Sequence, residues 1–193
     1  MIFDINMEDF WRKAQYVSGG HATVAPPTLT YASVVLRESV RISLTLAALN
    51  DLEVKTSDIQ NAYLNAPCSE KIWTTLGSEF GPDLAGKKAL VVRYLYGLKS
   101  VGSSFINHLT ECMRNLGYLS CLEDPDLWFK EETCPFDGAQ YYAFLFIYVY
   151  DCPFIHHTTD TALHELDHFF KMKSGSIGDT NMYLGSKRRK VVF

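Results

Sequence analysis

The sequence predicts an α+β fold built on an antiparallel sheet, and three observations lead to this class. Apolar residues recur every three to four positions over three segments, the spacing of helices with one buried face. Between these segments run stretches rich in β-branched and aromatic residues, which favour strands. With 193 residues, 47% of them hydrophobic, the chain is long enough to bury a core.

The N-terminal part is expected to contain strands, loops and one helix. Residues 1–35 include Gly19-Gly20 and Pro26-Pro27 among scattered apolar positions, which is typical of strand and loop. In Arg37–Leu49 the apolar residues fall at i, i+4, i+7 and i+8, which predicts a helix, and Asn50 is a suitable stop.

The segment Leu52–Ile59 is predicted to be a strand because its residues alternate in character. Successive side chains of a strand point to opposite faces, so Val54, Thr56 and Asp58 share one side. Asp58 therefore ends a strand, where its carboxylate can reach a cleft.

The middle of the chain is predicted to hold a strand pair and a helix. Lys71–Leu76 and Ala89–Leu95 are β-rich and flank a loop of Gly, Pro and Asp residues, so we expect them to pair. Ser103–Leu116 carries an apolar stripe at helical spacing, and Gly117 ends it. We expect the aromatic rings of Trp73 and Trp128 to lie in the core.

The C-terminal part is predicted to fold as a hairpin, a helix and a last strand. Tyr141–Val149 and Cys152–His156 form the hairpin, with Tyr150-Asp151 at its tip. Thr161–Met172 is the helix and Met182–Phe193 the strand. From residue 52 the main elements then follow the order β, α, β, β, α, β, which is a ferredoxin-like antiparallel sheet with helices on one face.

Composition bounds the function. The net charge of −4 argues mildly against a nucleic-acid partner, although Arg12-Lys13 and Lys87-Lys88 are locally basic. Five cysteines without a C-x-x-C pair argue against a disulfide framework and favour reduced, intracellular thiols. Because no apolar run approaches about 18 residues, no membrane span is expected.

Three short patterns follow one another in the order Asp58–Leu64, Leu95–Lys99 and Tyr148–Asp151. With further segments they resemble the reverse transcriptase of copia-type long-terminal-repeat retrotransposons. These further segments are Lys13–His21, Tyr31–Val35, Arg37–Arg41, Asp124–Trp128 and Tyr183–Gly185.

The resemblance implies an RNA-directed DNA polymerase with reverse-transcriptase fingers and palm and no thumb. Residues 1–51 and 66–94 would form the fingers-like region, and 52–65 and 95–193 the palm-like region. Partners would be an RNA or DNA template with primer and dNTP, together with the integrase and ribonuclease H parts of the same polyprotein. The expected location is intracellular, in cytoplasmic particles and the nucleus.

The resemblance also implies a metal site for two-metal nucleotidyl transfer. Asp58 and Asp151 would bind Mg²⁺ or Mn²⁺, which prefer carboxylate oxygens. Family members carry Tyr-x-Asp-Asp at the hairpin, and Tyr150 replaces the first of these two aspartates. A neutral phenol with a pKa near 10 is a poor Mg²⁺ ligand, so a catalytically defective enzyme with weakly bound metal is expected.

The remaining roles concern the nucleotide. Tyr63 would be the steric gate against a ribose 2′-hydroxyl, Gly97 and Lys99 would line the nucleotide and template site, and Lys13 would approach the triphosphate. The nucleotide-binding set implied by the resemblance is Ile59, Ala62, Tyr63, Gly97, Lys99 and Lys13.

Other departures from the family pattern favour a decaying copy or a fragment. Gln15 replaces an arginine, and Pro153 follows the hairpin tip, where proline is tolerated mainly at an edge or a bulge. No thumb or ribonuclease H sequence is found before Phe193.

Two alternatives remain open. The first is a non-catalytic nucleic-acid-binding or structural remnant of the same fold. The second is a zinc metalloprotease, because His164-Glu165-x-x-His168 places two histidines on one face of a helix. No His or Glu follows His168 as a third ligand, which leaves Asp179 or the upstream His156 and His157 for that place. Chance is the better explanation of this motif, and we expect no bound zinc.

Overall fold

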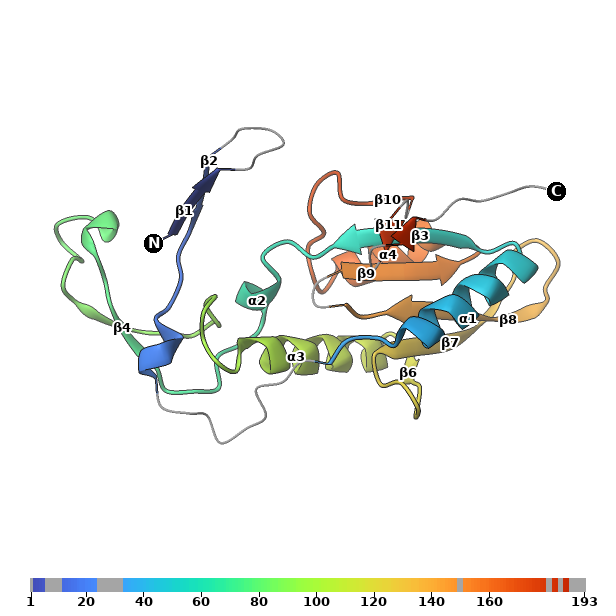
Figure 1. The fold of residues 1–193 in the computed structure, drawn as a ribbon, viewed down its shortest axis with the longest axis horizontal. Helices are drawn as coiled ribbons and strands as arrows, with labels where there is room; N and C mark the ends of the chain where they lie inside the picture. The colour runs from blue at the N-terminus through green and yellow to red at the C-terminus, as the bar shows by residue number, and fades with distance from the viewer. Residues whose placement is uncertain are drawn as a thin grey trace. The chain divides into compact units, whose positions relative to one another are not determined.

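The computed structural model describes residues 2–5, 12–23, 33–148, 151–179, 182–183 and 186–187. The chain is α+β and divides into two compact units (Figure 1). Unit 1 comprises Met1–Ala32 and Asn61–His108, and unit 2 comprises Ser33–Gln60 and Leu109–Phe193. Residues 33–51 thus fall in unit 2, whereas the sequence interpretation grouped them with residues 1–32 in the fingers-like region. The assignment of fingers and palm stays a prediction.

Unit 2 contains an antiparallel sheet with the strand order β10-β3-β9-β8-β7-β6. Its strands are β3 (Glu53–Asp58), β6 (Leu119–Ser120), β7 (Leu127–Thr133), β8 (Gln140–Phe146), β9 (Asp151–His156) and β10 (Gly178–Asp179). The strand β3 lies between β9 and β10, which come much later in the chain. The antiparallel sheet predicted from the sequence is therefore present.

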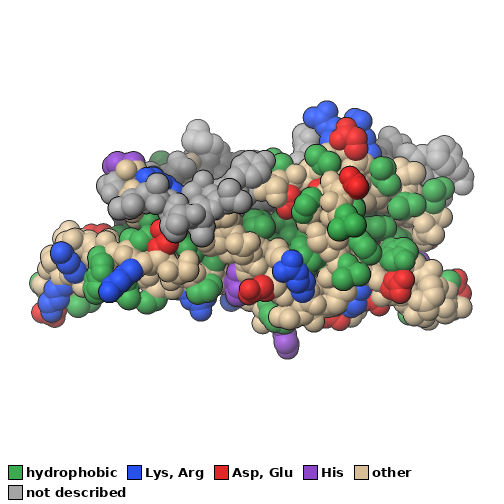
Figure 2. All heavy atoms as spheres, turned by 90° about the horizontal axis from the view of Figure 1, so that it is seen from below, with side chains coloured by type: hydrophobic (Ala, Val, Ile, Leu, Met, Phe, Trp, Pro, Cys, Tyr) green, Lys and Arg blue, Asp and Glu red, His purple; other side chains and the backbone are tan. Residues whose placement is uncertain are grey.

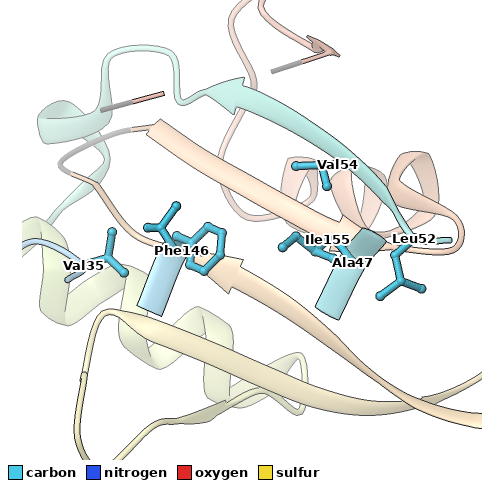
Figure 3. Packing of buried hydrophobic residues seen from close by; sticks show 7 residues of the cluster. Val35, Ala47, Leu52, Val54, Phe146 and Ile155 are labelled. Atoms are coloured by element: carbon cyan, nitrogen blue, oxygen red, sulfur yellow. The ribbon is translucent and has the colours of Figure 1, made fainter. Parts of the chain in front are cut away.

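The helices cover both faces of this sheet. Val40 and Ala47 of α1 (Arg37–Leu49) form one buried cluster with Val54, Phe146 and Ile155 (Figure 3). The helix α4 (Thr159–Asp167) lies on the other face, because its first residues bond to β3 residues that point away from Val54. The strand β9 is buried at five of its six positions because both faces are covered.

Two bonds fix α4 against β3. The Lys55 ammonium lies 2.8 Å from an Asp160 carboxylate oxygen, and the Thr159 hydroxyl donates to a Glu53 carboxylate oxygen at 2.7 Å. Cross-strand neighbours Lys55 and Phe154 share this face, whereas Val54 and Ile155 share the opposite one. The sequence predicted helices on one face of the sheet. In the structure α1 covers one face and α4 covers the other.

Several predicted boundaries were wrong. α4 ends at Asp167 instead of Met172, because the Asp167 carboxylate accepts the Met172 N–H at 2.8 Å and the chain then turns toward β3. The strand predicted over 182–193 begins instead as a short hairpin in which β11 (Met182–Tyr183) pairs with β12 (Ser186–Lys187). The sheet edge is formed by β10, which the sequence interpretation did not contain.

Proline 153 lies inside the sheet rather than at an edge. Pro153 is the partner of Thr56 in the β3–β9 pair. On the β8 side the ladder contains Phe144 opposite Ile155 and Leu145 opposite Phe154, and it stops before Pro153. Because proline has no N–H to donate, the ladder toward β8 ends where the proline begins.

Unit 1 consists of short elements. They are β1 (Ile2–Ile5), β2 (Arg12–Gln15), η1 (Gly20–Ala22), α2 (Ala62–Asn65), β4 (Trp73–Thr75), η2 (Ser78–Phe80) and β5 (Lys88–Leu90). The helix α3 (Val101–Asn115) begins in unit 1 and ends in unit 2. The strands β1 and β2 pair with each other, and so do β4 and β5, as predicted for Lys71–Leu76 and Ala89–Leu95.

The two tryptophans predicted to be core residues differ in burial. Trp128 is 2% exposed and lies below the Arg114 guanidinium, whereas Trp73 is 55% exposed. The prediction for Trp73 was therefore wrong. The reason is that β4 and β5 form a two-stranded sheet, and Trp73 lies with Leu90 on a face of it that stays largely exposed.

The cluster between α1 and the sheet predicts that two isoleucines differ strongly in how much their substitution by alanine lowers stability. We expect Ile155→Ala to lower the free energy of unfolding by about 2–5 kcal/mol, because Ile155 is fully buried and a cavity remains. Ile42→Ala on α1, where the side chain is 62% exposed, should change it by less than about 0.5 kcal/mol. Urea denaturation of both variants tests this, and equal effects would contradict the packing described.

Candidate active site

The two predicted catalytic aspartates face each other in the sheet. In the antiparallel β3–β9 pair, Asp58 is the direct partner of Asp151. Directly opposite residues point to the same face, so the two carboxylates lie on one side at the end of both strands. The sequence interpretation placed them side by side in this way. Their role as metal ligands stays a prediction.

The start of β9 is fixed by a closed pair of hydrogen bonds. Tyr148 N–H donates to Asp151 O at 3.1 Å, and Asp151 N–H donates to Tyr148 O at 2.9 Å. Asp151 therefore has a defined position at the hairpin end as well as opposite Asp58. Tyr150, predicted to replace a catalytic aspartate, lies outside the described residues.

The electrostatics of the pair show mutual repulsion that one lysine relieves. Burial raises the pKa of Asp151 above its usual range, and the nearby negative charge of Asp58 raises it further. Lys173 acts in the opposite direction, since its ammonium lies 3.4 Å from an Asp58 carboxylate oxygen. The site thus already contains one positive charge beside the two carboxylates.

Lys173 is positioned by a segment that runs beside the end of β3. Lys173 N–H donates to Asp58 O at 2.8 Å, and Gln60 N–H donates to Lys171 O at 2.9 Å. The Ser176 hydroxyl accepts the Asp58 N–H at 3.1 Å and donates to Lys173 O at 2.8 Å. These bonds fix the backbone of Lys173 against the strand that carries Asp58.

The sequence interpretation missed Lys173 and Ser176. It extended the helix to Met172, which left Lys173 at a helix end with no reason to meet Asp58. A weak signal was present in Ser174-Gly175-Ser176, because clustered Ser and Gly residues favour a turn. Gly175 has a positive φ of 75°, which glycine adopts without strain.

Two residues of the predicted nucleotide site are buried. Ile59 is 3% exposed and pairs with Met172, while Ala62 at the start of α2 is 1% exposed. Their side chains therefore belong to the interior. The nucleotide-binding role of both residues stays a prediction.

Tyr63 packs in unit 1 with other aromatic rings. Its ring lies 4.9 Å from that of Tyr96 and 5.9 Å from that of Phe105, measured between centroids, and it is partly exposed. It thus lies beside the residue that precedes Gly97, another member of the predicted nucleotide site. Asp58 and Tyr63 belong to different compact units, and their action at one site stays a prediction.

The turn at Gly97 is in very close contact with the chain before η1. Ser18 N–H donates to Tyr96 O at 2.7 Å. Gly97 has a φ of 90°, and a Cβ added there would clash with the carbonyl oxygen of Ser18. A Cβ added at Gly20 would in turn clash with the carbonyl oxygen of Gly97. Two glycines are required because two backbones touch.

The two predicted lysines of the nucleotide site lie in unit 1. The Lys99 ammonium donates to Thr23 O at 2.7 Å, and the Lys99 side chain is exposed. Lys13 is in β2, where its backbone is the partner of Asp4. Contacts of either lysine with a nucleotide remain a prediction.

The alternative zinc motif lies on and just after α4. His164, Glu165 and His168 are all exposed. Within the part of the chain that the structure describes, no group of three or more His, Cys, Asp or Glu side chains is arranged to hold a metal ion. That the two histidines bind no zinc stays a prediction, which metal analysis would test.

Comparison with known proteins gives one informative similarity. No known family profile matches the chain. A retrovirus-related Pol polyprotein from transposon TNT 1-94 of Nicotiana tabacum is 34% identical over 103 residues, which is 52% of this chain. The aligned stretch covers 8% of that polyprotein. The chain is thus similar to a short part of a retrotransposon Pol polyprotein.

Among the helices of the described ranges, none is both long enough and apolar enough to cross a bilayer.

The close contact at Gly97 predicts that a side chain there lowers stability by more than the strain of its positive φ alone would. We expect Gly97→Ala to destabilise by more than the ~1–3 kcal/mol typical of a strained backbone residue, because the added methyl also meets Ser18. The matched control is Gly138→Ala, where φ is 74° and nothing lies within 4 Å of the added Cβ. Thermal unfolding of both variants is the measurement, and equal losses would contradict the close approach.

The repulsion at Asp151 predicts a specific pH dependence. Because its folded pKa is raised, the folded state binds more protons than the unfolded state just above the usual Asp pKa, so stability falls as pH rises through that window. Asp151→Asn should therefore be more stable than wild type at pH 7, and the difference should vanish below about pH 4. Urea denaturation across this pH range measures it.

Asp137 provides the contrasting control. A hydrogen bond from Ala139 N–H lowers the pKa of Asp137. Asp137→Asn should consequently lose stability at pH 7 relative to wild type, the opposite sign. If Asp151→Asn also lowered the stability at pH 7, the folded state would not disfavour the charged Asp151 carboxylate, and the prediction would be wrong.

Proposed function

We propose that the chain is a reverse-transcriptase part of a copia-type retrotransposon polyprotein, with a catalytic site that is defective. The observation that carries the proposal is the direct opposition of Asp58 and Asp151 in the β3–β9 pair. The similarity to a transposon Pol polyprotein supports the same class of protein. Its substrates would be a primed RNA or DNA template and dNTPs, and integrase and ribonuclease H of the same polyprotein would be its partners.

The residues present fit a single hard cation better than two. Mg²⁺ and Mn²⁺ prefer carboxylate oxygens, and Asp58 and Asp151 supply them from adjacent strands. No third acidic ligand joins them among the described residues. When bound, such a cation would activate the primer hydroxyl and stabilise charge on the transferred phosphate.

The other residues would bind and orient the nucleotide. Tyr63, held against the Tyr96 ring, would present a flat surface under the sugar and exclude a 2′-hydroxyl. Lys13 would approach the triphosphate, and Gly97 and Lys99 would line the nucleotide and template site. These roles come from the family resemblance, and the ring contact of Tyr63 supports the first of them.

Two features account for the proposed defect. Tyr150 supplies a neutral phenol where the family has an aspartate, which removes one negative ligand. Lys173 also places an ammonium 3.4 Å from the Asp58 carboxylate, where a divalent cation would have to compete with it. The same features favour the second candidate function, a remnant that binds nucleic acid without catalysis.

The proposed defect predicts the metal affinity of a restored hairpin. Tyr150→Asp should bind Mn²⁺ more tightly than wild type, because a third carboxylate is added to Asp58 and Asp151. Calorimetric titration of both proteins is the measurement. Asp58→Asn in the Tyr150→Asp background is the control and should lose the added affinity. Equal affinity of wild type and Tyr150→Asp would show that Tyr150 is not the lesion.

Primer extension separates the two candidate functions. Removing one member of a cooperating catalytic set costs on the order of 10⁴–10⁶ in turnover, so the wild-type chain should extend a primed template no faster than Asp58→Asn. The assay uses one labelled dNTP with Mg²⁺ or Mn²⁺. Extension by wild type that Asp58→Asn abolishes would contradict the defect and establish an active polymerase.

A further inference from the structure

One face of the β4–β5 sheet is apolar, aromatic and exposed. Trp73 is the direct partner of Leu90, so both side chains point to the same face. They are 55% and 44% exposed, and Val92, two residues beyond Leu90, is 68% exposed. Singly exposed apolar residues are common, but a tryptophan with two exposed apolar neighbours on one small face requires an explanation.

The opposite face of the same sheet is the one that packs. The Tyr16 hydroxyl lies 3.5 Å from that of Thr74, and the Tyr16 ring lies 5.6 Å from the Phe80 ring. Val91, adjacent to Leu90, is 7% exposed. Because side chains alternate between faces, Trp73 points away from the face that carries the half-buried Thr74 and the buried Val91.

Lysines lie at both ends of the exposed face. Lys88 is the partner of Thr75. Val91 N–H donates to Ile72 O at 2.9 Å, so pairing continues beyond Trp73, and the exposed Lys71 directly precedes this pair. We call this surface the Trp73 face, and it consists of Lys71, Trp73, Thr75, Lys88, Leu90 and Val92.

The Trp73 face is positively charged although the whole chain is acidic. Its only charged members are two lysines, both exposed, whereas the net charge of the chain is −4. On the side of the molecule that Figure 2 draws, acidic, basic and hydrophobic side chains are interspersed. An aromatic ring between ammonium groups, with no carboxylate, suits a chain of stacked bases joined by phosphates.

We propose that the Trp73 face binds single-stranded nucleic acid, with Trp73 stacked on a base and Lys71 and Lys88 near phosphates. Identifying this strand as the template rests on the proposed function, but the binding itself does not. Stacking on an aromatic ring is tolerant of sequence, so no base preference is expected. A second copy of the chain fits less well, because a two-fold contact would place lysines against lysines.

The test measures binding without any divalent cation. Fluorescence anisotropy of labelled oligo(dT) and oligo(U) gives the affinity of wild type, Trp73→Ala and Trp73→Phe. Trp73→Ala should weaken binding about 5- to 150-fold, the equivalent of one stacked base, and Trp73→Phe should retain most of the affinity. Phe136→Ala removes an aromatic ring that is 81% exposed outside the Trp73 face, and it should leave binding unchanged.

Salt dependence tests the lysines separately. Lys71→Gln and Lys88→Gln should each reduce the slope of log affinity against log salt by about 0.7, as expected when one contact to a single-stranded phosphate is lost. Lys171→Gln, which changes an exposed lysine of unit 2, should leave the slope unaltered. An unchanged slope in Lys71→Gln and Lys88→Gln would overturn their assignment.

Three outcomes would overturn the proposal: no binding by wild type, equal loss in Trp73→Ala and Phe136→Ala, or a dimer in sedimentation that Trp73→Ala dissociates. Failure of the polymerase proposal is distinguishable, because the binding assay contains no divalent cation and its result does not depend on a metal at the aspartate pair. Suppose that binding depends on Trp73 but that Tyr150→Asp gains no Mn²⁺ affinity. The proposal for the Trp73 face would then stand, and the proposal of a polymerase site would fall.

Discussion

The antiparallel pairing of β3 with β9 is the constraint on which unit 2 depends. It runs from Glu53 opposite His156 to Asp58 opposite Asp151. Its register decides which side chains meet α1 and which meet α4, and it also places the two carboxylates together. A slip by one residue would move every β9 side chain to the other face, so the cluster around Ile155 and the aspartate pair depend on the same alignment.

The ends of these strands are held by segments that lack regular structure. Lys171–Ser176 bonds to the end of β3, and Asp124–Asp126 bonds to α1 and to the chain after β8. The Asp124 carboxylate accepts the Leu36 N–H at 2.9 Å, and Asp126 O accepts the Ile147 N–H at 2.9 Å. Burial raises the pKa of Asp126, and a side-chain hydrogen bond with Ser33 acts in the opposite direction.

Stability and the proposed chemistry conflict at the aspartate pair. Two carboxylates on adjacent strands repel each other, and one of them is partly buried, which is unfavourable for the folded chain. Lys173 relieves the repulsion without a metal ion. Because Lys173 supplies a positive charge beside both carboxylates, the pair can remain folded without further positive charge, which agrees with the proposed loss of activity.

The sequence by itself determined the elements with a strong local signal. The bounds of α1 follow from apolar spacing and Asn50, and Asp58 at a strand end follows from alternation. Only the tertiary structure decided the rest. Trp73 is exposed because the neighbouring strand residues face the interior, and Lys173 meets Asp58 through backbone bonds between distant segments. Local pattern encodes which face is apolar, whereas the partner of that face is set by contacts between residues far apart in the chain.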